Sequence, residues 1–239
     1  EAWLAERRRE LLPVPYFHLV FTLPHALNGV IAQRSRLLYE TLFDAAAATL
    51  TAFAADPRHL GGSLAFTRSL SSGQMCTPSR ALFVPAGGID TDQGHKSSDE
   101  FCADLAAAVQ RFLSKPEVAH AVLGAIQSAD TAERIDIANS GALGKVVLAS
   151  QKLDNPEFPG AKVRTPVLLA CDASDEKAYM EERFGPISFI VKVADTAAGI
   201  ALSERVVRTH GALTVGLYST RQDVIDAMTE ATWRGKVAL

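Results

Sequence analysis

Apolar residues recur with two different periods after residue 79, and this pattern predicts strands that alternate with helices. Short runs rich in β-branched and aromatic residues predict strands over Arg80–Val84, Lys145–Ser150, Thr165–Cys171, Ile187–Val193 and Ala212–Tyr218. Apolar spacings of three and four predict helices over Ser97–Leu113, Pro116–Leu123, Thr131–Ser140, Thr196–Arg208 and Arg221–Trp233. This order favours an α/β fold in which helices cover a mostly parallel sheet.

Two segments of this region have a more specific pattern. The run Ile187–Val193 is apolar almost throughout, which suits a strand in the middle of a parallel sheet. The segment Gln151–Arg164 contains Pro and Gly residues and is expected to be a loop between two strands.

The first part of the chain has a different composition, rich in Ala, Leu and Arg. Its pattern predicts a helix over Trp3–Leu12, a strand over Tyr16–Thr22 and a long amphipathic helix over Arg34–Ala55. We therefore expect two parts: a short α+β segment over residues 1–67 and an α/β domain over residues 68–239.

The overall composition is that of a globular protein, with 48% hydrophobic residues in a chain of 239. The formal net charge of −3 gives no reason to expect a nucleic acid as partner. No apolar run reaches the length of a membrane span, so no membrane association is expected. Three cysteines without metal-ligand spacing indicate a reducing compartment and no metal site, and we expect a cytoplasmic protein.

Two short motifs carry the candidate chemistry. Residues 72–77 read Ser-Gly-Gln-Met-Cys-Thr and place Cys76 on a short turn, and residues 181–186 read Glu-Glu-Arg-Phe-Gly-Pro. A cysteine near a helix start has its thiolate favoured by backbone dipoles, and its own N–H can stabilise an oxyanion. Cys76 is therefore the candidate nucleophile. Cys102 and Cys171 fall on the apolar side of a predicted helix and at a predicted strand end, where thiols pack without reacting.

From about Arg68 onward the chain resembles the catalytic part of aldehyde dehydrogenases, through these two motifs in this order. The amino-acid sequences of Lys145–Asp172 and Ala178–Ser219 are most similar to those of the phenylacetate-degradation branch of this family. The resemblance implies an oxidoreductase that oxidises a small-molecule aldehyde with NAD or NADP and that forms homo-oligomers. It also implies that Cys76 attacks the aldehyde and that Glu182 contacts the nicotinamide ribose.

The same resemblance places Phe184 beside the nicotinamide ring and gives Gln74 a structural role. In the family, the asparagine of the oxyanion hole, the glutamate that activates water and the glycine-containing cofactor turn lie upstream of Gly-Gln-x-Cys. This chain carries a different sequence there, so the dehydrogenase-like part is expected to be truncated. Two interpretations of Cys76 stay open: a former nucleophile in an inactive chain, or a nucleophile that works together with a partner chain.

Residues 1–67, especially Leu11–Pro24 and Ala54–Gly62, resemble rolling-circle two-tyrosine transposases of bacterial insertion sequences. The His-hydrophobic-His motif and the zinc-binding cysteines of that family have no counterpart here, so DNA transposition is not expected. The chain is interpreted as a fusion of a transposase fragment with a dehydrogenase fragment. The alternatives to a dehydrogenase are a non-catalytic chimeric remnant and a DNA-binding transposase remnant.

Overall fold

The computed structural model describes residues 69–74, 80–91, 94–212, 215–235 and 237. All of them lie within one compact unit, Phe53–Leu239. The helices and the strand predicted before residue 69 fall outside the described residues, as does Cys76 itself.

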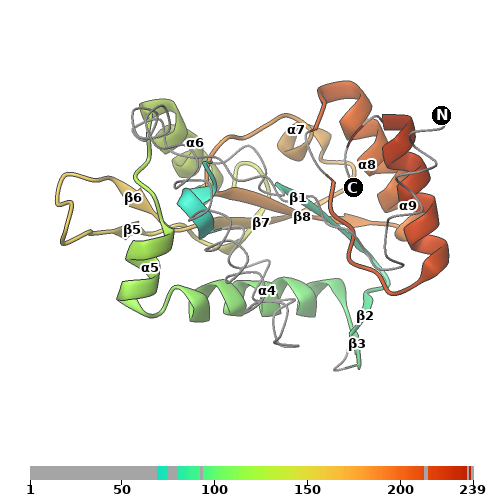
Figure 1. Cartoon of the computed structure of the whole chain (residues 1–239), viewed down its shortest axis with the longest axis horizontal. Helices are drawn as coiled ribbons and strands as arrows, with labels where there is room; N and C mark the ends of the chain where they lie inside the picture. Colours follow the sequence, from blue (N-terminus) through green and yellow to red (C-terminus); the bar gives the residue numbers. More distant parts are fainter. Residues whose placement is uncertain (1–68, 75–79, 92–93, 213–214, 236, 238–239) are drawn as a thin grey trace, which may run out of the picture. The chain divides into compact units, whose positions relative to one another are not determined.

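A four-stranded sheet forms the centre of the described chain, in the order β1-β8-β7-β4 (Figure 1). Strands β1 (Ala81–Pro85), β8 (Ile187–Val193) and β7 (Val167–Asp172) run parallel to one another. Strand β4 (Lys145–Leu148) pairs antiparallel with β7 at the edge. The predicted α/β class with a mostly parallel sheet is confirmed, and the apolar run of β8 occupies an interior position as expected.

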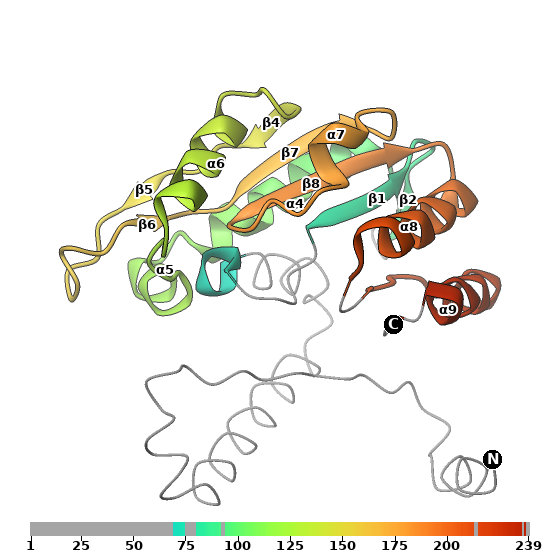
Figure 2. The ribbon, with the colours of Figure 1, turned by 90° about the horizontal axis from the view of Figure 1, so that it is seen from above.

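Helices cover both faces of this sheet, as the two views in Figures 1 and 2 show. Helix α4 (Ser98–Phe112) packs on one face. Helices α6 (Ala129–Asn139), α7 (Glu176–Tyr179) and α8 (Thr196–His210) pack on the other. Side chains alternate along β8, so Phe189 and Val191 face the second group while Ile190 faces α4. This alternation gives the sheet a buried core on each side.

Helix α4 begins where its sequence provides a cap. The Ser97 hydroxyl accepts a hydrogen bond from the backbone N–H of Glu100 at 3.2 Å, and the Glu100 carboxylate accepts one from the Ser97 N–H at 2.7 Å. This reciprocal pair is a capping box, and it satisfies two N–H groups that have no partner within the helix. The Ser97 hydroxyl also donates to the Glu100 carboxylate, at 2.7 Å, and this hydrogen bond together with that from the Ser97 N–H lowers the pKa of the Glu100 carboxyl.

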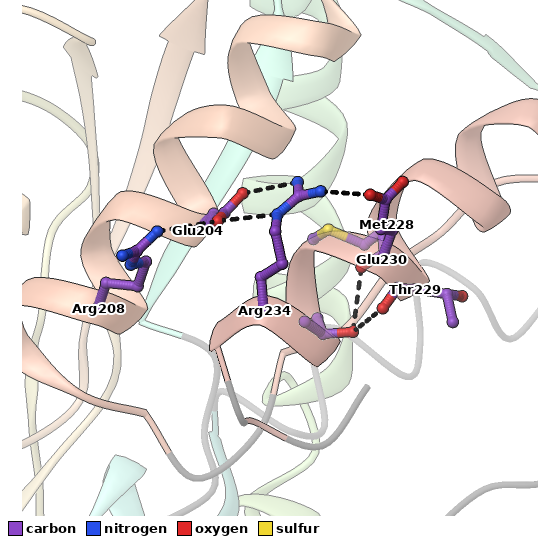
Figure 3. Close-up of polar contacts among 7 residues, drawn as sticks. Glu204, Arg208, Met228, Thr229, Glu230 and Arg234 are labelled. Carbon is purple, nitrogen blue, oxygen red and sulfur yellow. Dashed lines mark hydrogen bonds and ion pairs between the residues drawn. The ribbon is translucent and has the colours of Figure 1, made fainter.

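Helix α9 (Gln222–Gly235) packs against α8 through an ionic contact (Figure 3). The Arg234 guanidinium donates from Nε and Nη2 to the two oxygens of Glu204, at 3.1 and 2.9 Å. These hydrogen bonds lower the pKa of the Glu204 carboxyl. Arg234 also donates to Glu230 on its own helix at 2.7 Å, so one side chain ties α9 to α8 and stabilises its own last turns.

The structure differs from the sequence-based expectation at four places, one of which is the short helix α7, which the apolar pattern did not predict. The predicted loop Gln151–Arg164 contains a short antiparallel pair, β5 (Lys152–Leu153) with β6 (Val163–Arg164). The hairpin of β2 (Ile89–Thr91) and β3 (Gly94–Lys96) was not expected from its short polar segments. The prediction of a strand over Ala212–Tyr218 is wrong, because the described residues of this segment belong to none of the sheets.

Helix α5 (Pro116–Val122) completes the set and begins with proline, which suits a first helical turn. Among the described helices, none combines the length and the apolar composition needed to cross a bilayer.

We predict that Ile135 on α6 is essential for stability, because its side chain is 0% exposed in the core beneath the sheet. Ile135→Ala should lower the free energy of unfolding by about 2–5 kcal/mol, since it leaves a cavity. Ile137, on the same helix and 42% exposed, is the matched control, and Ile137→Ala should change stability by about 0.5 kcal/mol or less. Urea unfolding of both variants measures the difference, and equal effects would contradict the packing.

Candidate active site

The turn that leads to Cys76 is held by the hydroxyl of Ser72. This turn is a short 3₁₀ helix, η2 (Leu70–Gly73), and Ser72 adopts a left-handed backbone conformation with φ of 51°. Its buried Oγ lies 2.8 Å from the carbonyl oxygen of Gly124 and 3.1 Å from that of Arg164. A hydroxyl has one proton to donate, so the two carbonyls share it. The turn is thereby attached to two other segments of the chain.

Gln74 attaches the same turn to the loop before α6. Its Nε2 donates to the Ala125 carbonyl at 2.8 Å, and its Oε1 accepts from the Gln127 N–H at 2.9 Å. The side-chain amide therefore pairs with the backbone as a neighbouring strand would. Gln74 therefore connects the turn to this loop, which is a structural role, as expected.

The two motifs found in the sequence contact each other through their glycines. Gly73 has φ of +62°, and a Cβ atom there would lie 2.6 Å from the Gly185 carbonyl oxygen and 2.9 Å from Pro186 Cα. Only a residue without a side chain fits this approach. Gly185 in turn packs against α6, where a Cβ would lie 2.9 Å from Thr131 Cγ2. The turn leading to Cys76 and the segment 182–186 therefore lie in direct backbone contact.

Arg80 binds most of the second motif. Its Nη1 lies 3.0 Å from the Arg183 carbonyl and 3.2 Å from the Gly185 carbonyl, so each of its two protons has an acceptor. Its Nε lies 3.3 Å from Oε1 of Glu182. Its Cζ lies 5.1 Å from the centre of the Phe184 ring, within range of a cation–π interaction. One side chain thus contacts every residue from Glu182 to Gly185.

The backbone carbonyls contribute more to this arrangement than the ion pair. The Glu182 side chain is 66% exposed, and exposed ion pairs contribute only about 0–1 kcal/mol. Hydrogen bonds from a charged donor contribute about 1.5–3 kcal/mol each. Burial lowers the pKa of the Arg80 guanidinium and Glu182 opposes that shift, but an arginine stays charged at physiological pH.

A second arginine, Arg134 of α6, acts electrostatically on Arg80. It lowers the pKa of the Arg80 guanidinium, whereas Glu182 raises it. The buried Nε atoms of Arg134 and Arg183 have no hydrogen-bond acceptor within the described residues. Buried donors of this kind favour an anionic group nearby.

Glu182 and Phe184 were expected from their motif, whereas no role was expected for Arg80 or for the Ser72 hydroxyl. Glu182 is exposed and Phe184 is half-buried, and both follow the short helix α7 on the approach to β8. Their roles toward a cofactor, and that of Cys76 as nucleophile, stay predictions, because residues 75–79 lie outside the described ones. The position of Arg80 between the cysteine motif and β1 is a signal that could have drawn attention to it.

The other two cysteines are packed in the core. Cys102 lies on the buried side of α4, and Cys171 lies at the end of β7. Burial raises the pKa of both thiols, that of Cys171 to about 12. Reaction requires the thiolate, so both are expected to be inert, as the sequence predicted.

Comparison with known proteins assigns the fold to a family. A model of the aldehyde dehydrogenase family matches residues 46–239, which is most of the chain. The solved structure of an NAD-dependent aldehyde dehydrogenase from Burkholderia multivorans matches 77% of this chain with a TM-score of 0.73 and 43% identity. The chain belongs to the aldehyde dehydrogenase family.

Other matches are more distant or shorter. A methylmalonate-semialdehyde dehydrogenase of Sinorhizobium meliloti, solved with NAD, shares the fold over 71% of this chain with a TM-score of 0.54 and 16% identity. The NADP⁺ succinate-semialdehyde dehydrogenase of Deinococcus radiodurans is 28% identical over 137 residues, 57% of this chain. A Sinorhizobium fredii protein named as a transposase is 46% identical over 93 residues, 38% of this chain.

This chain is much shorter than the proteins that it matches. It covers 33% of the Burkholderia and of the Sinorhizobium meliloti dehydrogenases, 27% of the Deinococcus enzyme and 23% of the transposase. The match to a transposase supports the resemblance predicted for part of the chain. The boundary between residues 67 and 68 stays a prediction.

The residues around the second motif fit the nicotinamide end of a cofactor. The Glu182 side chain is 66% exposed, and its Oε1 lies 3.3 Å from Nε of Arg80. The Phe184 ring is half-buried and supplies an apolar surface.

We predict that Gly73→Ala destabilises the protein and disturbs the turn, because the new Cβ would meet backbone atoms at a positive φ. The loss in unfolding free energy should be about 1–3 kcal/mol. Gly87 is the control, since a Cβ there would meet nothing within 4 Å, and Gly87→Ala should leave stability almost unchanged. Thermal unfolding of both variants tests this, and a neutral Gly73→Ala would show that the two motifs do not touch.

We also predict that Cys171 makes stability depend on alkaline pH. Folding raises the pKa of its thiol from 9.0 to about 12, so the unfolded chain loses this proton first as the pH rises. The contribution is fully present below pH 9 and decreases as the pH rises from 9 toward 12. Urea unfolding at several pH values should show a smaller decline for Cys171→Ala than for the unchanged protein, and parallel declines would refute this assignment.

Proposed function

We propose that residues 68–239 form the nucleophile-bearing domain of an NAD(P)⁺-dependent aldehyde dehydrogenase. One observation carries this proposal: Gly73, three residues before Cys76, packs against Gly185 and Pro186 of the motif that is predicted to contact the cofactor. The nucleophile turn and the cofactor segment are therefore neighbours, as hydride transfer between their ligands requires.

The proposed chemistry begins with the Cys76 thiolate. It attacks the carbonyl carbon of a small-molecule aldehyde, and the resulting oxyanion is held by backbone N–H groups of the turn. NAD or NADP, when bound, would supply the hydride acceptor that is needed to oxidise this thiohemiacetal to a thioester. Water then cleaves the thioester, which releases the carboxylic acid and returns the thiol. Glu182 and Phe184 are the proposed contacts to the nicotinamide ribose and ring.

A relation to phenylacetate catabolism is the finer part of the proposal. It is supported by the similarity of the amino-acid sequences of Lys145–Asp172 and Ala178–Ser219 to the phenylacetate-degradation branch. These segments include β4, β7, β8 and α8. A homo-oligomer is proposed from the resemblance to the family, and a cytoplasmic location from the three cysteines without metal-ligand spacing. Activity of this chain alone is expected to be weak, because residues 1–67 resemble a transposase fragment where the family has its general base and cofactor turn.

A second candidate function is supported by the match to a transposase over 93 residues. In this alternative the chain is a chimera without catalysis, in which residues 1–67 derive from a transposase fragment. DNA binding by that fragment is a weaker possibility, and salt-dependent binding to duplex DNA would support it.

Hydrolysis of an activated aryl ester by the purified chain tests the first candidate. Acyl transfer uses the thiolate and the oxyanion site but needs no nicotinamide. We expect turnover that Cys76→Ala lowers by about a hundredfold or more, because the nucleophile is lost. Cys102→Ala is the control, since that buried thiol should contribute nothing. Equal background rates for all three proteins would favour the non-catalytic chimera.

A further inference from the structure

Arg80 makes a set of contacts that goes beyond what burial of an arginine requires. Its guanidinium donates to the carbonyls of Arg183 and Gly185 from one nitrogen and faces Glu182 with another. Its Cζ atom lies over the Phe184 ring, 5.1 Å from the ring centre. A guanidinium is rigid and planar, so these contacts together fix one orientation of the segment. A lysine has a single ammonium group and could not make all of them.

The backbone of Arg80 is itself fixed to the central sheet. Its carbonyl oxygen accepts a hydrogen bond from the Phe189 N–H of β8 at 2.7 Å. Arg80 also directly follows residues 75–79, which include Cys76, and directly precedes β1. The side chain thus originates directly before β1 and ends on the segment 182–185.

Arg80 is largely buried whereas Glu182 is exposed, so a ligand could reach Glu182 from the solvent side. The Arg80 side chain is 16% exposed, whereas that of Glu182 is 66% exposed. Arg80 therefore approaches Glu182 from the protein interior, with its Nε 3.3 Å from Oε1. The carboxylate is exposed enough for the hydroxyls of a ribose to reach it.

We propose that Arg80 is a positioning residue that fixes the Glu182 carboxylate and the Phe184 ring relative to the nucleophile turn. This inference rests on the proposed function for the identity of the ligand, a nicotinamide ribose. The position that Arg80 gives to the segment 182–185 is a property of the protein without ligand and is testable on its own.

Hydrogen exchange of the full chain, followed by mass spectrometry, tests this positioning directly. In Arg80→Met, which keeps an unbranched side chain but not the donors, the amides of residues 182–185 and 187 should exchange at least tenfold faster, while those of β7 stay unchanged. Arg164→Lys is the matched control: Arg164 is also buried, with a side chain 9% exposed, and pairs with Asp136, which is 66% exposed. It should leave the segment 182–187 protected. Unchanged exchange in Arg80→Met, or faster exchange throughout, would overturn the proposal.

Ligand binding then separates this inference from the proposed function. Arg80→Lys should weaken binding of NADH tenfold or more but should change binding of ADP-ribose, which lacks the nicotinamide, less than twofold. Equal losses for both ligands would overturn the role of Arg80 at the nicotinamide end. If the unchanged protein binds neither NADH nor ADP-ribose, the proposed function fails, and the exchange measurement alone decides on the positioning.

Discussion

The close approach of Gly73 to Gly185 is the constraint on which the candidate site depends. A carbonyl oxygen at 2.6 Å from a Cβ position leaves no room for any side chain, so two segments separated by more than a hundred residues share one van der Waals surface. Arg80 and Gln74 extend this contact on either side, toward the segment 182–185 and toward the loop before α6. The sheet keeps these segments in register, because β1 and β8 pair directly beside them.

The elements that the sequence predicted well are those decided by local pattern. Helix α4 follows the apolar spacing that predicted it, although its cap of Ser97 with Glu100 was not predicted, and the apolar run of β8 indicates burial on both faces. The strand predicted at Ala212–Tyr218 failed because a strand forms only beside a partner, and local composition does not specify one. The same limit applies to the β2–β3 hairpin, whose segments are short and polar.

The candidate site shows the same division between local and distant information. Glu182 and Phe184 were found because they belong to a contiguous motif. Arg80 was missed because its acceptors lie 103 and 105 positions away, and Ser72 was missed because its acceptors lie 52 and 92 positions away. No spacing rule links such positions, and only the topology of the sheet brings them together.

The conformation of Ser72 determines when residues 70–74 become ordered: on folding, before any ligand binds. A non-glycine residue with positive φ costs about 1–2 kcal/mol, and it persists here because two carbonyls and a buried environment determine its conformation. The conformational entropy of residues 70–74 is therefore lost when the chain folds. A molecule arriving later at the neighbouring turn would find these residues already arranged, and none of its binding energy would be needed to order them.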